Sequence, residues 1–333
     1  MLYYTSVVTP AALREALARF PSLPLVATPT LVEPMPRLRD RLGGGPRLLI
    51  KRDDAIAFAF GGNKVRKLAF VGAKAQADGA DTLITAGGVQ SNHARVTAAT
   101  AAKLGMRAVL VANGVRPERT TANALLDTLL GAEVVHVPSR EDRAAKMLEL
   151  AERLRTEGGH PFAIPIGAST PLGALGYAAA VAELADQIPP PDVIVHSSSS
   201  GGTQAGLVAG CRLLGLPIRV LGISADEPAA GLQAQVRAIV SGIADLLDMD
   251  PHALAKGTAI EVDDRFVGEG YGIPTEGSRE AIELTARSEA IFLDPTYTAK
   301  AMAALIAYVR QQKFVEGQTV LFWHTGGQVA LFA

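Results

Sequence analysis

The chain has 333 residues, 48% of them hydrophobic and 20% charged, so it can bury a sizeable core, and bulk disorder is excluded. Its 32 basic and 33 acidic residues leave a formal net charge of −1, which argues against a nucleic-acid or anionic-membrane partner. Because it has one cysteine, no apolar run of about 18 residues and no basic start before an apolar stretch, we expect a cytoplasmic globular protein without a disulfide, a metal site or a membrane span.

The chain is irregular before residue 82 and alternates between two patterns after it. Gly61 and Gly62 precede a helical run that starts near Asn63. From Thr82 onward, short β-branched runs are followed by segments with helical spacing, one of which should end at Gly105. This alternation predicts βαβ units and parallel sheets that helices cover on both faces. The expected strands are 82–86, 107–113, 133–137, 193–197, 218–224 and 319–324, and QIPPP at 187–191 should join a helix to the fourth.

Lys64 follows the first glycine pair at the expected start of a helix. The positive end of the helix and the nearby Arg66 and Lys67 would lower the pKa of its amine and make it a better nucleophile toward an aldehyde. The alternative is a surface lysine on an amphipathic helix. Position alone does not decide between the two.

A second Gly-Gly turn ends the strand at 82–86 and opens a helix with Gln90, Ser91, Asn92 and His93. Free backbone N–H groups at a helix start favour an anion, and this one would suit a substrate carboxylate. The alternative is an ordinary helix cap by Ser91 or Asn92.

The third turn follows the strand at 193–197 and contains Ser200, Gly201, Gly202 and Thr203. The glycines allow an anion to approach the backbone closely, and the two hydroxyls can add donors, so the turn is a candidate phosphate site. The alternative is a Ser/Gly loop in which Thr203 caps the helix.

Four motifs in this order, GGNKVRKL, GGVQSNHARV, SSGGTQAG and LDPTYxxK, resemble the 1-aminocyclopropane-1-carboxylate deaminase / D-cysteine desulfhydrase family. Its members are pyridoxal-phosphate enzymes of the tryptophan synthase β-subunit type (fold type II). The resemblance runs from about Leu31 to the C-terminus. It implies pyridoxal 5′-phosphate as cofactor, a homodimer, and two α/β domains with open twisted parallel sheets: a small one at 68–176 and a large one at 1–67 plus 177–333.

The resemblance also assigns roles to single residues. It matches Lys64 to the lysine that carries the cofactor covalently, Lys67 to a basic residue close to the phosphate, and Asn92 to the residue beside the cofactor's 3′ oxygen. It matches the turn at Gln90–His93 to the substrate-carboxylate site, where Ser91 can also relay protons. The remaining matches are the phosphate loop, Ser200, Gly201, Gly202 and Thr203, and two active-site tyrosines, Tyr271 and Tyr297.

Two threonines separate the branches of this family. Thr298 stands at the position where the deaminase branch looks to carry a glutamate that meets the pyridine nitrogen of the cofactor. Thr325 stands at a position where that branch resembles a pattern with an apolar residue. A neutral hydroxyl makes the cofactor a weaker electron sink than a carboxylate does, which suffices to expel a thiolate. His93, which gives QSNH in place of QSNQ, favours the same branch of the family, although less specifically. The resemblance therefore favours β-elimination from a small β-substituted amino acid, with D-cysteine giving pyruvate, sulfide and ammonia.

Several alternatives stay open at this point. Within the family they are 1-aminocyclopropane-1-carboxylate deaminase and L-cysteate sulfo-lyase, and the chirality of the substrate is not fixed. A nicotinamide dehydrogenase would need the G-x-G-x-x-G fingerprint, which the sequence lacks. A cofactor-binding protein without catalysis is disfavoured because Lys64 and both tyrosines are intact.

Overall fold

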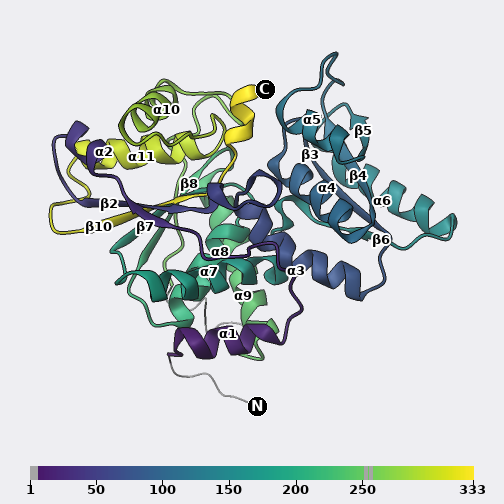
Figure 1. Cartoon of the computed structure of the whole chain (residues 1–333), viewed down its shortest axis with the longest axis horizontal. Coiled ribbons are helices and arrows are strands. Elements are labelled where there is room, and N and C mark those ends of the chain that lie inside the picture. Colours follow the sequence, from purple (N-terminus) through teal and green to yellow (C-terminus); the bar gives the residue numbers. More distant parts are fainter. Residues whose placement is uncertain (1–6, 251–253, 255–257) are drawn as a thin grey trace.

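Two β-sheets carry the fold, which the computed structural model describes for residues 7–250, 254 and 258–333 (Figure 1). The larger sheet has the strand order β1-β2-β10-β7-β8-β9 and the smaller has the order β5-β4-β3-β6. The paired strands are parallel except β1 with β2. The predicted class of open parallel α/β sheets is therefore confirmed, with an antiparallel strand added at one edge.

Strands of the larger sheet send apolar side chains alternately to two helical layers. Val193 and Val195 of β7 belong to one hydrophobic cluster and Ile194 belongs to another. Helices α2, α10 and α11 cover the first face, and α7, α8 and α9 cover the second (Figure 1). The strands are β1 (Val32–Pro34), β2 (Arg47–Arg52), β7 (Val193–Ser198), β8 (Arg219–Ser224), β9 (Glu261–Asp263) and β10 (Thr319–His324). The helices are α2 (Pro36–Arg41), α7 (Pro171–Gln187), α8 (Gly202–Leu213), α9 (Ala229–Leu246), α10 (Glu276–Glu289) and α11 (Thr298–Arg310).

The smaller sheet is built in the same way. Ile84 and Val109 pack against α6, whereas Leu83 and Leu110 face the layer that holds α3 and α4. Gly105 ends α4 in the left-handed conformation, as predicted. The strands are β3 (Thr82–Gly88), β4 (Arg107–Asn113), β5 (Glu133–Val137) and β6 (Pro161–Ala163), and the helices are α3 (Asn63–Ala77), α4 (Asn92–Leu104), α5 (Ala122–Leu129) and α6 (Asp142–Thr156).

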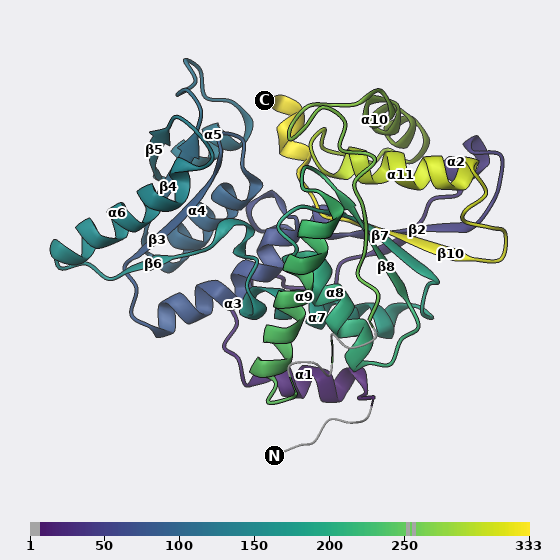
Figure 2. The same cartoon turned by 180° about the vertical axis from the view of Figure 1, so that it is seen from behind.

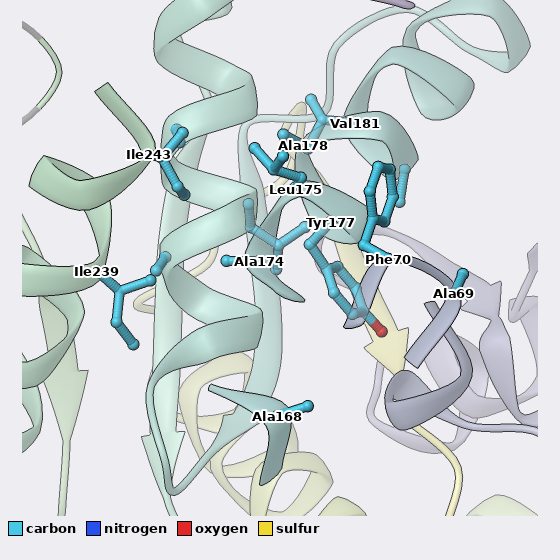
Figure 3. Packing of buried hydrophobic residues seen from close by; sticks show 14 of the residues in the cluster. Ala69, Phe70, Ala168, Ala174, Leu175, Tyr177, Ala178, Val181, Ile239 and Ile243 are labelled. Carbon is cyan, nitrogen blue, oxygen red and sulfur yellow. The ribbon is translucent and has the colours of Figure 1, made fainter. Parts of the chain in front are cut away.

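One hydrophobic cluster runs from the smaller sheet into the larger. Phe70 of α3, Tyr177 of α7 and Ile239 of α9 belong to it (Figure 3). Seen from behind, α9 lies with α7 and α8 in this layer, and α1 (Pro10–Ala18) packs against α7 (Figure 2). Short 3-10 helices complete the fold at η1 (Asp53–Ala55), η2 (Phe58–Phe60), η3 (Ile166–Ala168) and η4 (Gln328–Phe332).

A buried ionic network also joins the two parts. Arg66 of α3 donates to Asp53 at 2.8 Å and to Glu183 of α7 at 2.9 Å. Asp53 is fully buried and also accepts from the Tyr177 hydroxyl at 2.7 Å and from Trp323 Nε1 at 2.8 Å. The network links α3 with η1, α7 and β10.

The predicted domain boundaries fall inside helices. The junction at 67/68 lies within α3 and that at 176/177 lies within α7. Residues 1–6, 251–253 and 255–257 of the expected large domain lie outside the described residues. The division into two domains at these positions stays a prediction. Among the described residues, none of the helices is long and apolar enough to cross a membrane.

Candidate active site

The three turns singled out in the sequence converge on one cavity. The carboxyl ends of β3, β7 and β10 and the starts of α3, α4 and α8 meet there, as the crevice rule for parallel sheets predicts. The cavity is open to solvent, and about 420 Å³ of atom-free space lies in it when that solvent space is included. It is lined by Asn63, Lys64, Lys67, Asn92, Ser197, Ser198, Ser199, Ser200, Gly201, Thr203, Tyr297, Thr325 and Gly326.

Lys64 enters the cavity from the first turn of α3. Its Nζ donates to Asn63 Oδ1 at 2.9 Å. Removal from water and, second, the charge of Arg95 lower its pKa to about 8, while Asp294 opposes the shift. The preceding turn needs Gly62, which has φ 98° and whose Cβ would lie 2.9 Å from the Thr325 carbonyl oxygen.

Of the two cations that the sequence suggests for Lys64, Arg66 and Lys67, Arg66 is not a cause of its lowered pKa. Arg66 is held by Asp53 and Glu183 on the far side of α3, and Arg95 of α4 takes the expected electrostatic role. On a helix, neighbouring residues point to different sides, so Arg66 at two positions from Lys64 faces away from it.

The start of α8 has the features of an anion site. Gly201 is the N-cap with φ 76°, and no side chain caps the helix. The Thr203 cap weighed as an alternative is wrong, because the Thr203 hydroxyl accepts from Asn63 Nδ2 at 2.9 Å. Buried Lys67 lies beside this turn: its Nζ donates to the Gly167 carbonyl and to Ser169 Oγ, each at 3.2 Å.

The cradle at this turn depends on the absence of a side chain. A Cβ on Gly202 would lie 2.7 Å from Ser169 Oγ and 3.0 Å from Lys67 Nζ. Lys67 bonds to neutral oxygens, and both burial and the charge of Lys64 lower its pKa. A phosphate would supply the negative charge that this lysine and the uncapped helix start favour.

The turn before α4 brings one of its predicted residues to the cavity lining. Asn92 lines the cavity, whereas the Gln90 amide bonds to Thr121 and Asn123 at the start of α5. His93 is buried and its Nε2 bonds to the Thr85 hydroxyl at 2.8 Å. Ser91 caps α4, with its Oγ accepting from the Ala94 N–H at 3.2 Å. The capping alternative is thus confirmed for Ser91.

The two predicted tyrosines lie together. Tyr297 lines the cavity and its hydroxyl bonds to that of Tyr271, with ring centroids 5.8 Å apart. Burial raises the pKa of both phenols, so both are protonated near neutrality. The Arg140 guanidinium lies 5.5 Å from the centre of the Tyr271 ring and pairs with Asp226 at 3.0 Å.

The two branch-specific threonines have different surroundings. Thr325 lines the cavity. Thr298 is fully buried, and its hydroxyl donates to Asp294 Oδ1 at 2.7 Å. Asp294 also accepts the N–H groups of Thr296, Tyr297 and Thr298 and thereby holds the start of α11.

Asn63, Ser169, Asp294 and Arg95 are site residues that the sequence analysis misses. Asn63 and Asp294 have a usable signal, since a polar residue at a helix start is typical of a cap. Ser169 has none, because its role depends on how the loop before α7 packs against α8.

Comparisons with known proteins show the family to which the chain belongs. Residues 23–326 match the pyridoxal-phosphate dependent enzyme family, so the chain belongs to that family. It is 43% identical to a D-cysteine desulfhydrase of Klebsiella pneumoniae over 96% of this chain and 98% of the relative, and 42% identical to one of Salmonella newport over 95% and 97%. A solved 1-aminocyclopropane-1-carboxylate deaminase homologue is 35% identical, with TM-score 0.89 and 96% of each chain covered. A threonine deaminase from Solanum lycopersicum, 18% identical with TM-score 0.67 over 98% of this chain and 87% of that one, shares the fold.

The family membership confirms the predicted fold type II and pyridoxal phosphate as the cofactor. The residues present fit that group. Lys64, with its lowered pKa, stands at one part of the cavity lining. The uncapped start of α8 and the buried Lys67 stand at another part. Among the described residues, no cluster of His, Cys, Asp and Glu is suited to hold a metal ion.

Proposed function

We propose that the chain is a lyase that removes the β-substituent of a small amino acid, with D-cysteine as substrate and pyruvate, sulfide and ammonia as products. The observation that carries the proposal is the cavity in which Lys64 and the neutral Thr325 meet. The D-cysteine desulfhydrases that match nearly the whole chain support the substrate.

Each part of the cofactor has a group of residues to hold it. Lys64 would bind its aldehyde, and Asn92 would contact its ring oxygen. The phosphate would be held by Lys67 and the turn made of Ser200, Gly201, Gly202 and Thr203. When bound, pyridoxal phosphate supplies an electron sink that stabilises negative charge at the α-carbon.

Lys64 is the residue best suited to take the α-proton. The amine can be unprotonated near neutrality because its pKa is lowered to about 8. Tyr271 and Tyr297 stay protonated, so they act as hydrogen-bond donors rather than bases. Ser91 already accepts the Ala94 N–H, and a proton relay through it would need a further partner.

The elimination would balance with the bound cofactor as electron sink and one water molecule, the substrate amine taking the place of the Lys64 amine at the aldehyde and so freeing that amine. The α-proton passes to the Lys64 amine, and its electron pair forms the Cα–Cβ double bond. The Cβ–S bond breaks, and sulfur leaves with the bonding pair as the thiolate. Hydrolysis of the resulting aminoacrylate then gives pyruvate and ammonia. The resemblance sets Thr298 at the pyridine nitrogen, but Thr298 is absent from the cavity lining and its hydroxyl bonds to Asp294. Thr325, which lines the cavity, is therefore the neutral group proposed for the pyridine nitrogen, and its lack of charge suits a reaction with a good leaving group.

A substrate panel tests the proposal. The purified holoenzyme is assayed with D-cysteine, L-cysteine, L-cysteate and 1-aminocyclopropane-1-carboxylate, and pyruvate, sulfide, sulfite and 2-oxobutyrate are measured. We expect pyruvate and sulfide from D-cysteine and little 2-oxobutyrate. Equal or faster formation of 2-oxobutyrate would replace the proposal by the deaminase, and sulfite from L-cysteate would replace it by the sulfo-lyase.

We also propose that the protein works as a cytoplasmic homodimer. The family resemblance supports the dimer, and the single cysteine in 333 residues fits a reducing compartment. Light scattering on the purified protein tests the dimer, and a monomer at micromolar concentration would contradict it.

A further inference from the structure

The Asn92 side chain is shared between the cavity and a buried polar cluster. It lines the cavity beside Lys64. Its Oδ1 accepts from Arg95 Nη1 at 3.0 Å and from Asn123 Nδ2 at 3.0 Å. A guanidinium can only donate, so the end of the amide that faces Arg95 must be the oxygen. The Asn92 nitrogen is therefore the end that remains for a ligand.

The cluster leaves the Asn123 amide no second orientation. Asn123 is fully buried, and its Oδ1 accepts from Arg95 Nη1 at 2.7 Å. Its Nδ2 donates to the Gln90 carbonyl at 2.9 Å as well as to Asn92. Turning this amide would set its nitrogen against a donor and its oxygen against a carbonyl.

Arg95 extends the cluster to the turn before Lys64. It is 1% exposed, and its Nη2 donates to the Gly61 carbonyl at 3.0 Å. One side chain thus contacts both the Asn92 amide and the glycine turn that leads into α3, where Lys64 lies. Neither Arg95 nor Asn123 is among the described residues that line the cavity. Asn123 therefore acts through Asn92, and Arg95 acts through Asn92 and through its charge on Lys64.

We propose that Arg95 and Asn123 are positioning residues that hold the Asn92 amide with its nitrogen toward the cavity, so that Asn92 can only donate a hydrogen bond to an oxygen of the bound cofactor. The inference rests on the proposed place of Asn92 at the cofactor, and it does not depend on the substrate.

The substitution Asn123→Asp tests the proposal. It keeps the shape and the bond from Arg95 but replaces the donor to Asn92 Oδ1 and to the Gln90 carbonyl by an oxygen. One of the two hydrogen bonds that hold the Asn92 amide becomes a repulsion, so the amide should no longer be held in one position. We expect the dissociation constant of pyridoxal phosphate from the apoprotein, measured by titration at pH 8, to rise about tenfold or more, the usual effect of losing one buried hydrogen bond. The absorption maximum of the saturated protein should also shift.

Asn113→Asp is the matched control. Asn113 ends β4, and its Oδ1 accepts from Arg143 Nη1 at 3.3 Å, so the same change beside an arginine is made away from the cavity. We expect cofactor affinity and spectrum to stay as in the wild type.

A second series keeps the test valid if Asn123→Asp does not fold. Arg95→Lys retains a donor and the charge, whereas Arg95→Met removes both, so affinity should fall in the order wild type, Arg95→Lys, Arg95→Met. Unchanged affinity and spectrum in folded variants, with binding weakened by Asn92→Ala, would overturn the positioning role alone. If Asn92→Ala also binds normally, the proposed place of Asn92 is wrong and the positioning role is overturned with it.

Discussion

Lys64 and Lys67 are close in sequence but have different partners in the site. Lys64 bonds to Asn63, and Lys67 bonds to the loop before α7. We expect borohydride reduction of the holoenzyme, followed by peptide mapping, to place the cofactor on Lys64. Lys64→Ala should abolish the label and Lys67→Ala should only weaken cofactor binding. A label on Lys67 or Lys300 would contradict the assignment.

Asp127 is a buried carboxyl in α5 whose charge is poorly compensated. Its Oδ1 has no hydrogen-bond partner among the described residues, and burial raises its pKa to about 7 against a smaller opposing effect of Arg95. Because the pKa of Asp127 is higher in the folded than in the unfolded state, the folded state binds a proton more tightly at this carboxyl. The contribution to stability is therefore complete below about pH 4 and is lost as the pH rises through 7.

Replacing this carboxyl should change how stability depends on pH. For Asp127→Asn, the advantage of the variant in free energy of unfolding should grow between pH 4 and pH 7, by on the order of a few kcal/mol. Urea unfolding at several pH values measures it, with the exposed Asp78→Asn as control. A difference that is constant over this range would show that Asp127 is ionised throughout.

At the scale of the element, the glycine-rich start of α8 is the proposed cofactor cradle. Gly202→Ala would put a Cβ 2.7 Å from Ser169 Oγ and 3.0 Å from Lys67 Nζ, whereas the Cβ of Gly231→Ala in α9 would meet nothing within 4 Å. We expect Gly202→Ala to weaken cofactor binding by about tenfold or more and Gly231→Ala to leave it unchanged. Equal affinities of the two variants, measured by titration of the apoprotein, would make the turn merely structural.

The elements that the sequence predicts well are those whose own pattern determines them. The β-branched runs 107–113, 133–137 and 319–324 are strands with these bounds, because each is long enough for its own composition to mark it as a strand. β1, β6 and β9 span three residues each, too few for any periodicity, and they are strands only because a neighbour pairs with them.

The same limit applies to the site. Glycine turns and the helix starts that follow them are local, so Lys64, Asn92 and Thr203 could be located from sequence. The contacts of Gln90 with α5 and of Thr298 with Asp294 depend on which side of a helix packs inward. A turn motif does not contain that information. For the same reason, the sequence could not show that Arg95, rather than Arg66, is the cation whose charge lowers the pKa of Lys64.

At the scale of the whole molecule, the buried network of Arg66, Asp53 and Glu183 ties the two sheets together. Asp53→Asn would leave the Arg66 charge undercompensated in the interior. We expect a loss of about 3–5 kcal/mol in the free energy of unfolding, in a single transition by fluorescence and circular dichroism. Asp186→Asn, which breaks the exposed pair with Arg14, is the control and should cost at most about 1 kcal/mol. Two separate transitions of the unmodified protein would show that the network does not couple the sheets.

The ion pair of Arg140 and Asp226 bears on how fast small molecules enter and leave the cavity. Arg140 follows β5 of the smaller sheet and Asp226 follows β8 of the larger, and Asp226 also accepts from Ser199 in the cavity lining. Arg140 is 46% exposed, so the pair is worth about 1 kcal/mol at most, and dissolved ions weaken it. This tie between the two sheets, next to Ser199 of the cavity lining, is therefore a contact that ordinary thermal motion can break, whereas the network of Arg66, Asp53 and Glu183 is buried. Ionic strength should thus change how fast small molecules enter and leave without changing how firmly the protein is folded.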